Sequence, residues 1–323
     1  MLHVRVVSPA DRTGEVEEAL LDCPAVTNVA VLPGAARRPS GDLVLCDVAR
    51  EGANAVLDTL RGLGLEENGS IAVERVDLSV SRGAEEAQRA APGYGDDAVI
   101  WEELDRRTIE ETRVTWAYLA FLAIATQIAA IGVLVPSTIL IVGAMVLGPE
   151  FGAVSAICFG LLRRDWPRIA AAARTLVIGF AAAIAVTFLC AIVSRWLGWI
   201  DPSWLDLNKE MEFIVKPDRW SFIVALLAGT AGVLSITAGR SSALVGVFIS
   251  VTTVPAAGNI AVGLALSHLG EVWGSLAQLG VNLAGMILAG TATLAVQRVA
   301  WRKYGFRLPG PTRRSVTGPR REP

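Results

Sequence analysis

The sequence predicts an α-helical membrane protein preceded by a small soluble α+β domain. Of the 323 residues, 53% are hydrophobic, and the long apolar segments all follow residue 113. Residues 1–113 contain 12 Lys and Arg against 22 Asp and Glu, whereas residues 114–323 contain 17 against 9. The acidic part suits water, whereas the apolar, basic part suits a membrane. We therefore expect a cytoplasmic domain at 1–80, a linker and polar helix at 81–113, a membrane domain at 114–300 and a basic disordered tail at 301–323.

The N-terminal segment has a β-α-β-β-α-β pattern. Leu2, Val4 and Val6 alternate with polar residues as in a half-buried strand, and a helical stripe follows the candidate cap Thr13. Further elements are expected at 29–32, 43–48, 53–63 and 76–80, with a turn at Pro33-Gly34. This order and length resemble a ferredoxin-like sandwich, which suits either a ligand-binding regulatory domain or an interaction module.

Six apolar segments are long enough to cross the roughly 30 Å hydrocarbon core of a bilayer. They lie at about 115–135, 137–162, 169–197, 220–239, 242–267 and 273–297. Basic residues lie in alternate connections and beside both ends of this region, which places both termini in the cytoplasm and the 198–219 loop outside. Tryptophans near the segment boundaries suit the membrane interface. We therefore expect a multi-pass protein of the cell membrane.

Gly148-Pro149-Glu150 interrupts the second apolar segment near its midpoint. Lipid cannot bond the backbone group that a proline frees, and a charge at the centre of a membrane helix costs about 2.5–3.5 kcal/mol on insertion scales. The triplet must therefore face protein or water. Pro255 lies near the midpoint of the fifth segment, with Gly258 one turn later. Transporters often bring such broken helices together at the membrane midplane.

The two halves of the membrane region repeat one another. Trp116 recurs 104 residues later as Trp220, and Pro149 matches Pro255 at an offset of 106. Because each half has three segments, an odd number, the second copy would be upside down relative to the first. The expected architecture is thus six transmembrane helices in an inverted 3+3 repeat.

Eight residues are candidates for transport or ion binding: Gln127, Gly148, Pro149, Glu150, Pro255, Gly258, Asn259 and Asn282. Glu150 would bind or neutralise a cation or proton, and the broken backbone would offer carbonyl groups and helix ends to the solute. The alternative for the amides is hydrogen bonding between helices, and for Glu150 a protonated acid bonded to a neighbouring helix. Thr252 and Thr253 are expected to bond carbonyls freed by Pro255.

Two sequence blocks carry a resemblance to a known family. The first runs from Ile141 to Pro149 with Gly152 and Gly160 after it, and the second runs from Ser235 to Pro255. They are similar to a bacterial family of uncharacterised hydrophobic proteins, number 389 among domains of unknown function, over about residues 110–300. The resemblance implies a polytopic membrane protein and no particular activity. At Glu150 the chain departs from the family pattern, in which this position is usually apolar.

These observations predict a transporter or channel for a small solute or ion with a cytoplasmic regulatory domain. The second hypothesis is a membrane-anchored sensor whose N-terminal domain binds a small ligand. We expect no enzyme, metal or cofactor, because the apolar segments lack a nucleophilic constellation and the four cysteines and two histidines lack metal-site spacing. The expected partners are the lipid bilayer and a small solute or cation, not nucleic acid, and homo-oligomers remain an option.

Overall fold

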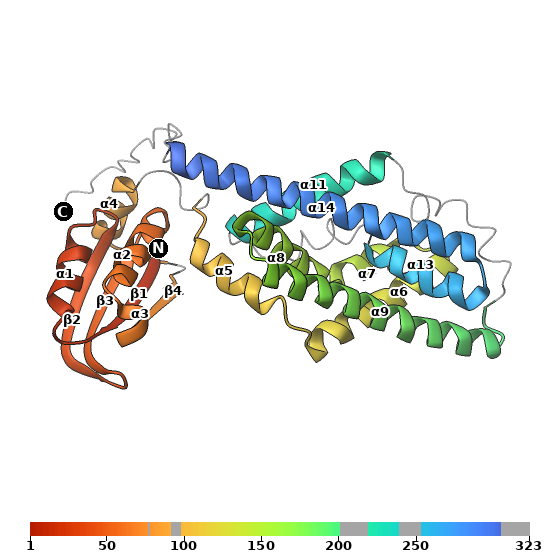
Figure 1. Cartoon of the computed structure of the whole chain (residues 1–323), viewed down its shortest axis with the longest axis horizontal. Helices are drawn as coiled ribbons and strands as arrows, with labels where there is room; N and C mark the ends of the chain where they lie inside the picture. The colour runs from red at the N-terminus through yellow and green to blue at the C-terminus, as the bar shows by residue number, and fades with distance from the viewer. Residues whose placement is uncertain (77, 92–97, 201–218, 239–252, 305–323) are drawn as a thin grey trace, which may run out of the picture. The chain divides into compact units, whose positions relative to one another are not determined.

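A computed structural model describes residues 1–76, 78–91, 98–200, 219–238 and 253–304 (Figure 1). The chain divides into one unit of Met1–Ile100 with Arg298–Pro323 and a second unit of Trp101–Gln297. The first unit contains the elements β1 (Leu2–Ser8), α1 (Thr13–Leu21), β2 (Val26–Arg37), β3 (Ser40–Val48), η1 (Arg50–Gly52), α2 (Ala53–Gly62), α3 (Leu65–Asn68), β4 (Ser70–Arg75) and α4 (Arg82–Ala90).

The first unit is built on a four-stranded antiparallel sheet with the order β2-β3-β1-β4. The expected order of the main elements, β-α-β-β-α-β, is observed. Alternating residues of β1 and β3 point to one face and meet the apolar stripes of α1 and α2. This core contains Val4, Val6, Val16, Leu20, Val44, Cys46, Val48, Val56, Leu60 and Leu65, all buried. The period-2 and period-3.6 patterns in the sequence therefore identified the buried faces.

Two predicted details of the sheet are wrong. Pro33-Gly34 does not form the turn between strands, because both residues lie inside β2 at a register shift, where Gly34 has φ +63°. The Gly34 amide donates to Asp42 Oδ1 at 2.8 Å, which stabilises this bulge. The last strand ends at Arg75 rather than at Val80, and Val80 is 89% exposed. The alternation of apolar residues continues beyond Arg75, so the sequence pattern predicted the last strand too far along the chain.

The predicted linker contains a helix that packs on the sheet. Helix α4 begins after Ser81, whose hydroxyl accepts from the Ala84 amide at 3.3 Å, and it contacts β2 and β3. Its small residues Ala84 and Ala87 are buried against the strands. Ile100 packs with Leu2, Ala53 and Leu57 in a second cluster. The packed unit therefore continues beyond residue 80.

We expect a fragment of residues 1–100 to fold alone and to be more stable than a fragment of residues 1–80. Removing residues 81–100 uncovers the surface beneath Ala84, Ala87 and Ile100, which are buried in the whole unit. Urea unfolding followed by circular dichroism, with dispersed amide NMR signals as the test of folding, measures the difference. Equal unfolding free energies for the two fragments would contradict the packing of α4.

The second unit is helical. Its helices are α5 (Trp101–Glu110), α6 (Trp116–Leu134), α7 (Thr138–Leu147), α8 (Glu150–Arg163), α9 (Trp166–Trp196), α11 (Arg219–Ala238), α13 (Thr253–Leu266) and α14 (Leu269–Tyr304), of which α14 extends past the unit. Four of them are long and apolar enough to cross a membrane: α6, α9, α11 and α14. Helices α7 and α8 form a bent pair that counts as a fifth span if it is one broken helix.

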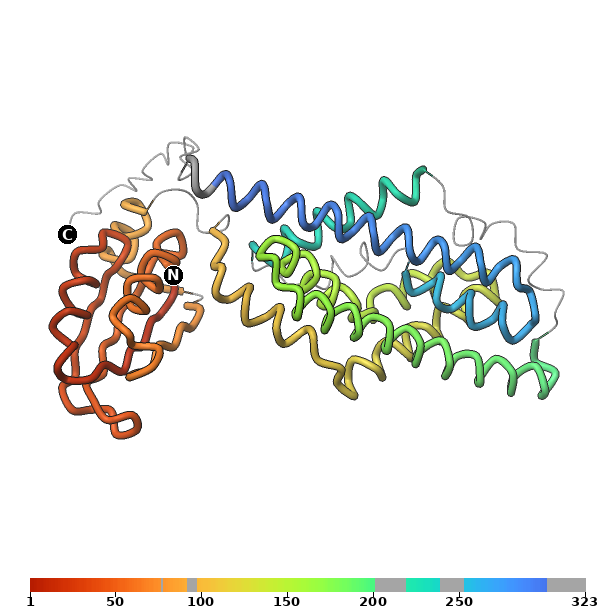
Figure 2. The backbone as a smooth tube through the Cα atoms, viewed as in Figure 1, coloured from red at the N-terminus to blue at the C-terminus, as the bar shows by residue number. Residues whose placement is uncertain are grey.

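The described residues therefore do not form the six continuous spans that the sequence predicts. The second predicted span is the bent pair α7 and α8. The fifth, at 242–267, is represented by the 14-residue helix α13, and residues 239–252 lie outside the described part of the chain. Figure 2 follows the backbone of this unit through the long helices α9 and α14. Apolar helices of this number and length indicate a membrane protein.

The polar helix α5 packs on α8 and the start of α9. Asp105 Oδ1 accepts from Arg168 Nη1 at 2.8 Å, and the Arg168 guanidinium also stacks over the Phe159 ring at 5.1 Å. Thr175 in α9 donates to the carbonyl of Thr112 at 2.6 Å. These contacts hold the segment that precedes α6 against the α8–α9 hairpin.

Candidate functional site

The break in the second apolar segment lies where the sequence predicts it. Gly148 is the C-cap of α7 and Pro149 is the N-cap of α8, and the two helices are bent by 53°. Proline lacks an amide hydrogen, so it ends the hydrogen-bonding of α7 and is tolerated at the start of α8. The next residue, Glu150, is the first residue of α8.

Glu150 is fully buried and bonded to a residue from the other half of the chain. Its side chain is 0% exposed, and its Oε1 accepts from Thr253 Oγ1 at 2.6 Å. Thr253 is itself the first residue of α13, and it is also 0% exposed. The expectation that Thr253 serves the backbone around Pro255 missed this role, because its hydroxyl donates to a carboxylate 103 residues away.

Helices α8 and α13 run in opposite directions from this contact. The turn between α8 and α9 brings Gly160 against Ile169, so α8 packs antiparallel to the first part of α9. At the far end of α9, Arg195 Nη1 donates to the Ala265 carbonyl near the end of α13 at 2.8 Å. Helix α13 therefore runs parallel to the second part of α9 (Figure 1). Thr253, the first described residue of α13, thus meets the N-terminus of α8 beside the 31-residue helix α9.

Two opposed helix ends meet at the break beside Glu150. The N-terminus of α8 carries about +0.5 of an elementary charge from its unpaired amides, and the C-terminus of α7 carries about the opposite charge. Glu150, as the first residue of α8, places a buried acidic side chain at the end that favours negative charge.

A second carboxylate lies close to the same helix end. A Cβ atom built on Gly152 would lie 2.0 Å from Glu111 Oε2, so this glycine makes room for the Glu111 side chain in the first turn of α8. Burial raises the pKa of Glu111. The sequence analysis did not single out Glu111, because it does not stand out within its local pattern.

Pro255 and Gly258 are placed differently from the expectation. Both lie inside α13, so the carbonyls of 255–258 belong to a regular helix and are not free to bind a solute. Pro255 is in the first turn, where a missing amide costs nothing. Gly258 lets α13 approach α6, since a Cβ there would lie 2.9 Å from the Ala130 nitrogen. The matching of Pro149 with Pro255 is wrong in terms of helix position, because Pro149 precedes its helix and Pro255 lies within one.

The three candidate amides have different surroundings. Gln127 is half-buried in α6. Asn259 is buried in α13 and its Nδ2 donates to Ser275 Oγ at 2.9 Å and to Glu271 Oε2 at 3.3 Å. Asn282 is buried in α14. The structure brings Asn259 together with α14 residues that the sequence analysis did not name, although their three- and four-residue spacing could have revealed them.

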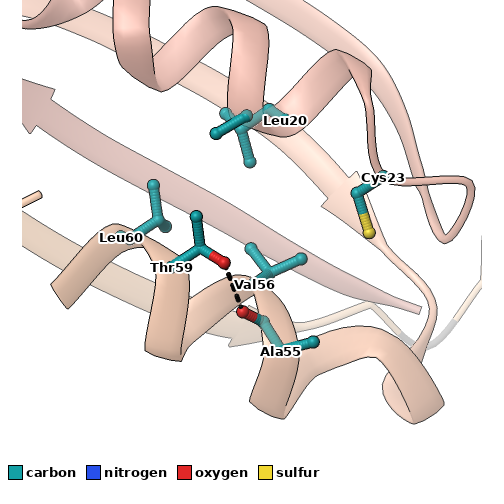
Figure 3. Close-up of a pocket in the computed structure, with 7 residues that line it drawn as sticks. Leu20, Cys23, Ala55, Val56, Thr59 and Leu60 are labelled. Atoms are coloured by element: carbon teal, nitrogen blue, oxygen red, sulfur yellow. Dashed lines mark hydrogen bonds between the residues drawn. The ribbon is translucent and has the colours of Figure 1, made fainter. Parts of the chain in front are cut away.

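The N-terminal unit has a small apolar pocket between α1 and α2 (Figure 3). Its cavity volume is about 60 Å³, and it is lined by Ala19, Leu20, Cys23, Ala55, Val56, Thr59 and Leu60. The Thr59 hydroxyl already donates to the Ala55 carbonyl at 2.9 Å. Ligand sites combine an apolar wall with several convergent polar groups, and this pocket offers few. It therefore gives little support to a specific polar ligand.

Comparison with known proteins agrees with the resemblance seen in the sequence. Residues 145–288 match the family model described as a domain of unknown function (DUF389). The chain is 27% identical over 212 residues to an uncharacterized protein of Methanocaldococcus jannaschii, an alignment that covers 66% of this chain. The alignment spans 62% of that relative's length. No solved structure matches the chain. The resemblance predicted from the sequence is confirmed over residues 145–288, and this relative is archaeal rather than bacterial.

Proposed function

We propose that this chain, which carries a DUF389 domain, is a proton-coupled membrane transporter for a small solute, with Glu150 as the coupling residue. The observation that carries the proposal is a fully buried carboxylate at the break between α7 and α8, bonded to Thr253 of the other half of the chain. A buried ionisable group within membrane helices is costly and is typical of ion and proton pathways. Discontinuous helices that meet near the midplane are typical of transporter sites.

The helix boundaries support an inverted 3+3 repeat with an offset of 103 residues. Helices α9 and α14 begin at 166 and 269. The turns that follow α8 and α13 also correspond, with positive φ at Arg164 (59°) and Ser267 (65°). The same offset relates Gly160 to Gly263 in the sequence, whereas Trp116 and Pro149 recur at offsets of 104 and 106. Opposite directions of α8 and α13 are what an inverted second copy produces.

Contacts between the halves support the same arrangement. Helix α13 packs on α6 of the first half through Gly258. In the second half, α11 approaches α8 at Gly232, where a Cβ atom would lie 2.2 Å from the Phe151 ring. Helix α13 of the second half thus packs on α6 of the first half, and α8 of the first half packs on α11 of the second. A solute path between two such halves can open alternately to either side when one half moves against the other.

In this proposal the N-terminal unit is a ferredoxin-like cytoplasmic regulatory domain. The sensor hypothesis would need a ligand site in that unit, and the small apolar pocket between α1 and α2 does not favour one. The buried polar groups favour transport, because a unit that only anchors a sensor has no need of a carboxylate at a helix junction.

The proposed orientation places both termini and the Arg163–Arg168 loop in the cytoplasm. Basic residues favour the cytoplasmic side, and the 198–219 loop would then be external. We expect a single cysteine at position 209, in a background lacking the four native cysteines, to react with an impermeant thiol reagent added to cells. A cysteine at position 303 should react only after the membrane is opened. The reverse pattern would overturn the orientation.

Reconstituted vesicles test the function itself. Purified protein in vesicles loaded with a pH-sensitive dye should move protons when a transported solute is added on one side, across a panel of small solutes. Protein-free vesicles are the control. If no solute evokes proton movement or accumulates under any pH gradient, the transport proposal fails and the sensor hypothesis takes its place.

A further inference from the structure

One side of helix α14 is polar and buried over roughly half of the thickness of a bilayer's hydrocarbon core. Ser275, Gln278 and Asn282 are each 0% exposed, and Glu271 precedes them on the same face at half-burial. Their spacing of three and four residues aligns them along one side of a helix. With a rise of about 1.5 Å per residue, the eleven steps from residue 271 to residue 282 extend about 16 Å, which is roughly half the hydrocarbon thickness.

This polar face lies against α13 in an antiparallel register. Asn259 in α13 donates to Ser275 Oγ at 2.9 Å, and a Cβ on Gly263 would lie 3.0 Å from Val272 Cγ2. For any two positions that face each other in this antiparallel pair, the two residue numbers therefore add up to about 535. Continued along the pair, this register brings Asn282 level with Thr253, the residue that bonds Glu150. The polar face of α14 thus leads from the α13–α14 loop to the proposed coupling site.

Gln278 shows that this face needs partners beyond the described protein groups. Within the described part of the chain, neither its Oε1 nor its Nε2 has a hydrogen-bond partner, although both atoms are buried. Each unsatisfied buried donor or acceptor costs about 1–3 kcal/mol. The register brings Gln278 level with Ala256 and Ala257, whose small side chains take little space beside the amide. An occupant must both donate and accept hydrogen bonds, which water does and a bare cation does not.

We propose that Glu271, Ser275, Gln278 and Asn282, together with Asn259, line a file of water molecules that leads from the α13–α14 loop to Glu150. Water satisfies the Gln278 amide in both of its roles, and Ser275 can donate to a neighbouring water while it accepts from Asn259. Such a file gives protons access to a carboxyl group that is fully buried. This inference rests on the proposed function only in taking Glu150 as the end of the path.

Cysteine accessibility tests the water file without requiring transport. In a protein whose four native cysteines are replaced, single variants S275C, Q278C and N282C are compared with L276C and L288C. Leu276 and Leu288 are 46% and 62% exposed on α14, on the side that faces lipid. Thiols in water ionise and react with a water-soluble methanethiosulfonate, whereas thiols in lipid do not. In nanodiscs we expect the first three to react at least about tenfold faster than the last two.

A second pair of variants tests continuity. Q278L should slow labelling of N282C about tenfold or more, because it removes both polar atoms at the middle of the file. Q297L is the matched control on the same helix: Gln297 donates to Thr237 at 2.9 Å, outside the 271–282 face, and labelling of N282C should be unchanged. Thermal unfolding checks that both variants fold, with Q278M replacing Q278L where it does not. Equal labelling of positions 276 and 278, or labelling at 282 that Q278L leaves unchanged, overturns the proposal. Proton transport plays no part in these results, so failure of the path and failure of the transport function are distinguishable.

Discussion

Replacing Glu150 by glutamine should abolish proton-coupled transport to the level of protein-free vesicles while the protein still folds. The glutamine oxygen can still accept from Thr253 Oγ1, which lies 2.6 Å from the carboxylate in the wild type. The amide cannot ionise, so the N-terminus of α8 loses the negative charge that opposes it. Proton flux in vesicles at several pH values, alongside thermal unfolding, measures both parts. A Glu150→Gln variant with wild-type flux and unchanged pH dependence would make this glutamate structural.

Glu111→Gln is the comparison variant for this experiment. Glu111 lies against Gly152 in the same helix turn, and burial raises its pKa, so it holds its proton to a higher pH than an exposed glutamate does. We expect Glu111→Gln to shift the pH at which transport is half-maximal and to leave transport present. Loss of transport in Glu111→Gln alone would move the coupling role to Glu111.

Replacing Gly229 by alanine should destabilise the second unit strongly. A Cβ at this position in α11 would lie 2.4 Å from the Met286 carbonyl oxygen and 2.7 Å from the Met286 Cα in α14. Both are backbone atoms, so no side-chain rotation relieves the clash and the two helices must separate. Overpacking of this kind costs about 1–3 kcal/mol or more. Thermal unfolding in detergent should show a clearly lower midpoint than the wild type.

Gly280→Ala is the matched control in α14. A Cβ at Gly280 would meet nothing within 4 Å. Alanine is favoured over glycine in a helix by about 0.5–1 kcal/mol, so this variant should be as stable as the wild type or more so. Equal midpoints for Gly229→Ala and Gly280→Ala would mean that α11 and α14 do not approach each other as closely as described.

Features that depend on local chemistry were predictable from the sequence. The interruption at Gly148-Pro149 follows from the missing amide of proline, and the burial of Glu150 follows from its position in an apolar segment. The sheet and both packed helices of the first unit follow from apolar periodicity, because each of them buries one face. The end of β4 was misplaced because alternation at Leu78 and Val80 resembles a strand but has no partner strand.

Features that depend on contacts between distant segments were not predictable. Nothing near Thr253 in the sequence indicates that its hydroxyl meets a carboxylate 103 residues earlier. Gly229, Gly232 and Gly258 are close-contact positions, but glycine occurs in all six apolar segments and the sequence does not separate these three from the rest. Gln278 was not among the predicted site residues, although it lies on the same helix face as Asn282, which was. A search of each span for polar residues at three- and four-residue spacing would have found it.

The Glu150–Thr253 contact also sets a problem for biosynthesis. Glu150 leaves the ribosome 103 residues before the threonine that bonds it. At about 5–20 residues per second, the carboxylate waits about 5–20 seconds for its partner. A charge held at the centre of a membrane helix over that time costs about 2.5–3.5 kcal/mol on insertion scales. The nascent first half therefore has to remain in an aqueous channel of the insertion machinery, or keep Glu150 protonated, until α13 arrives.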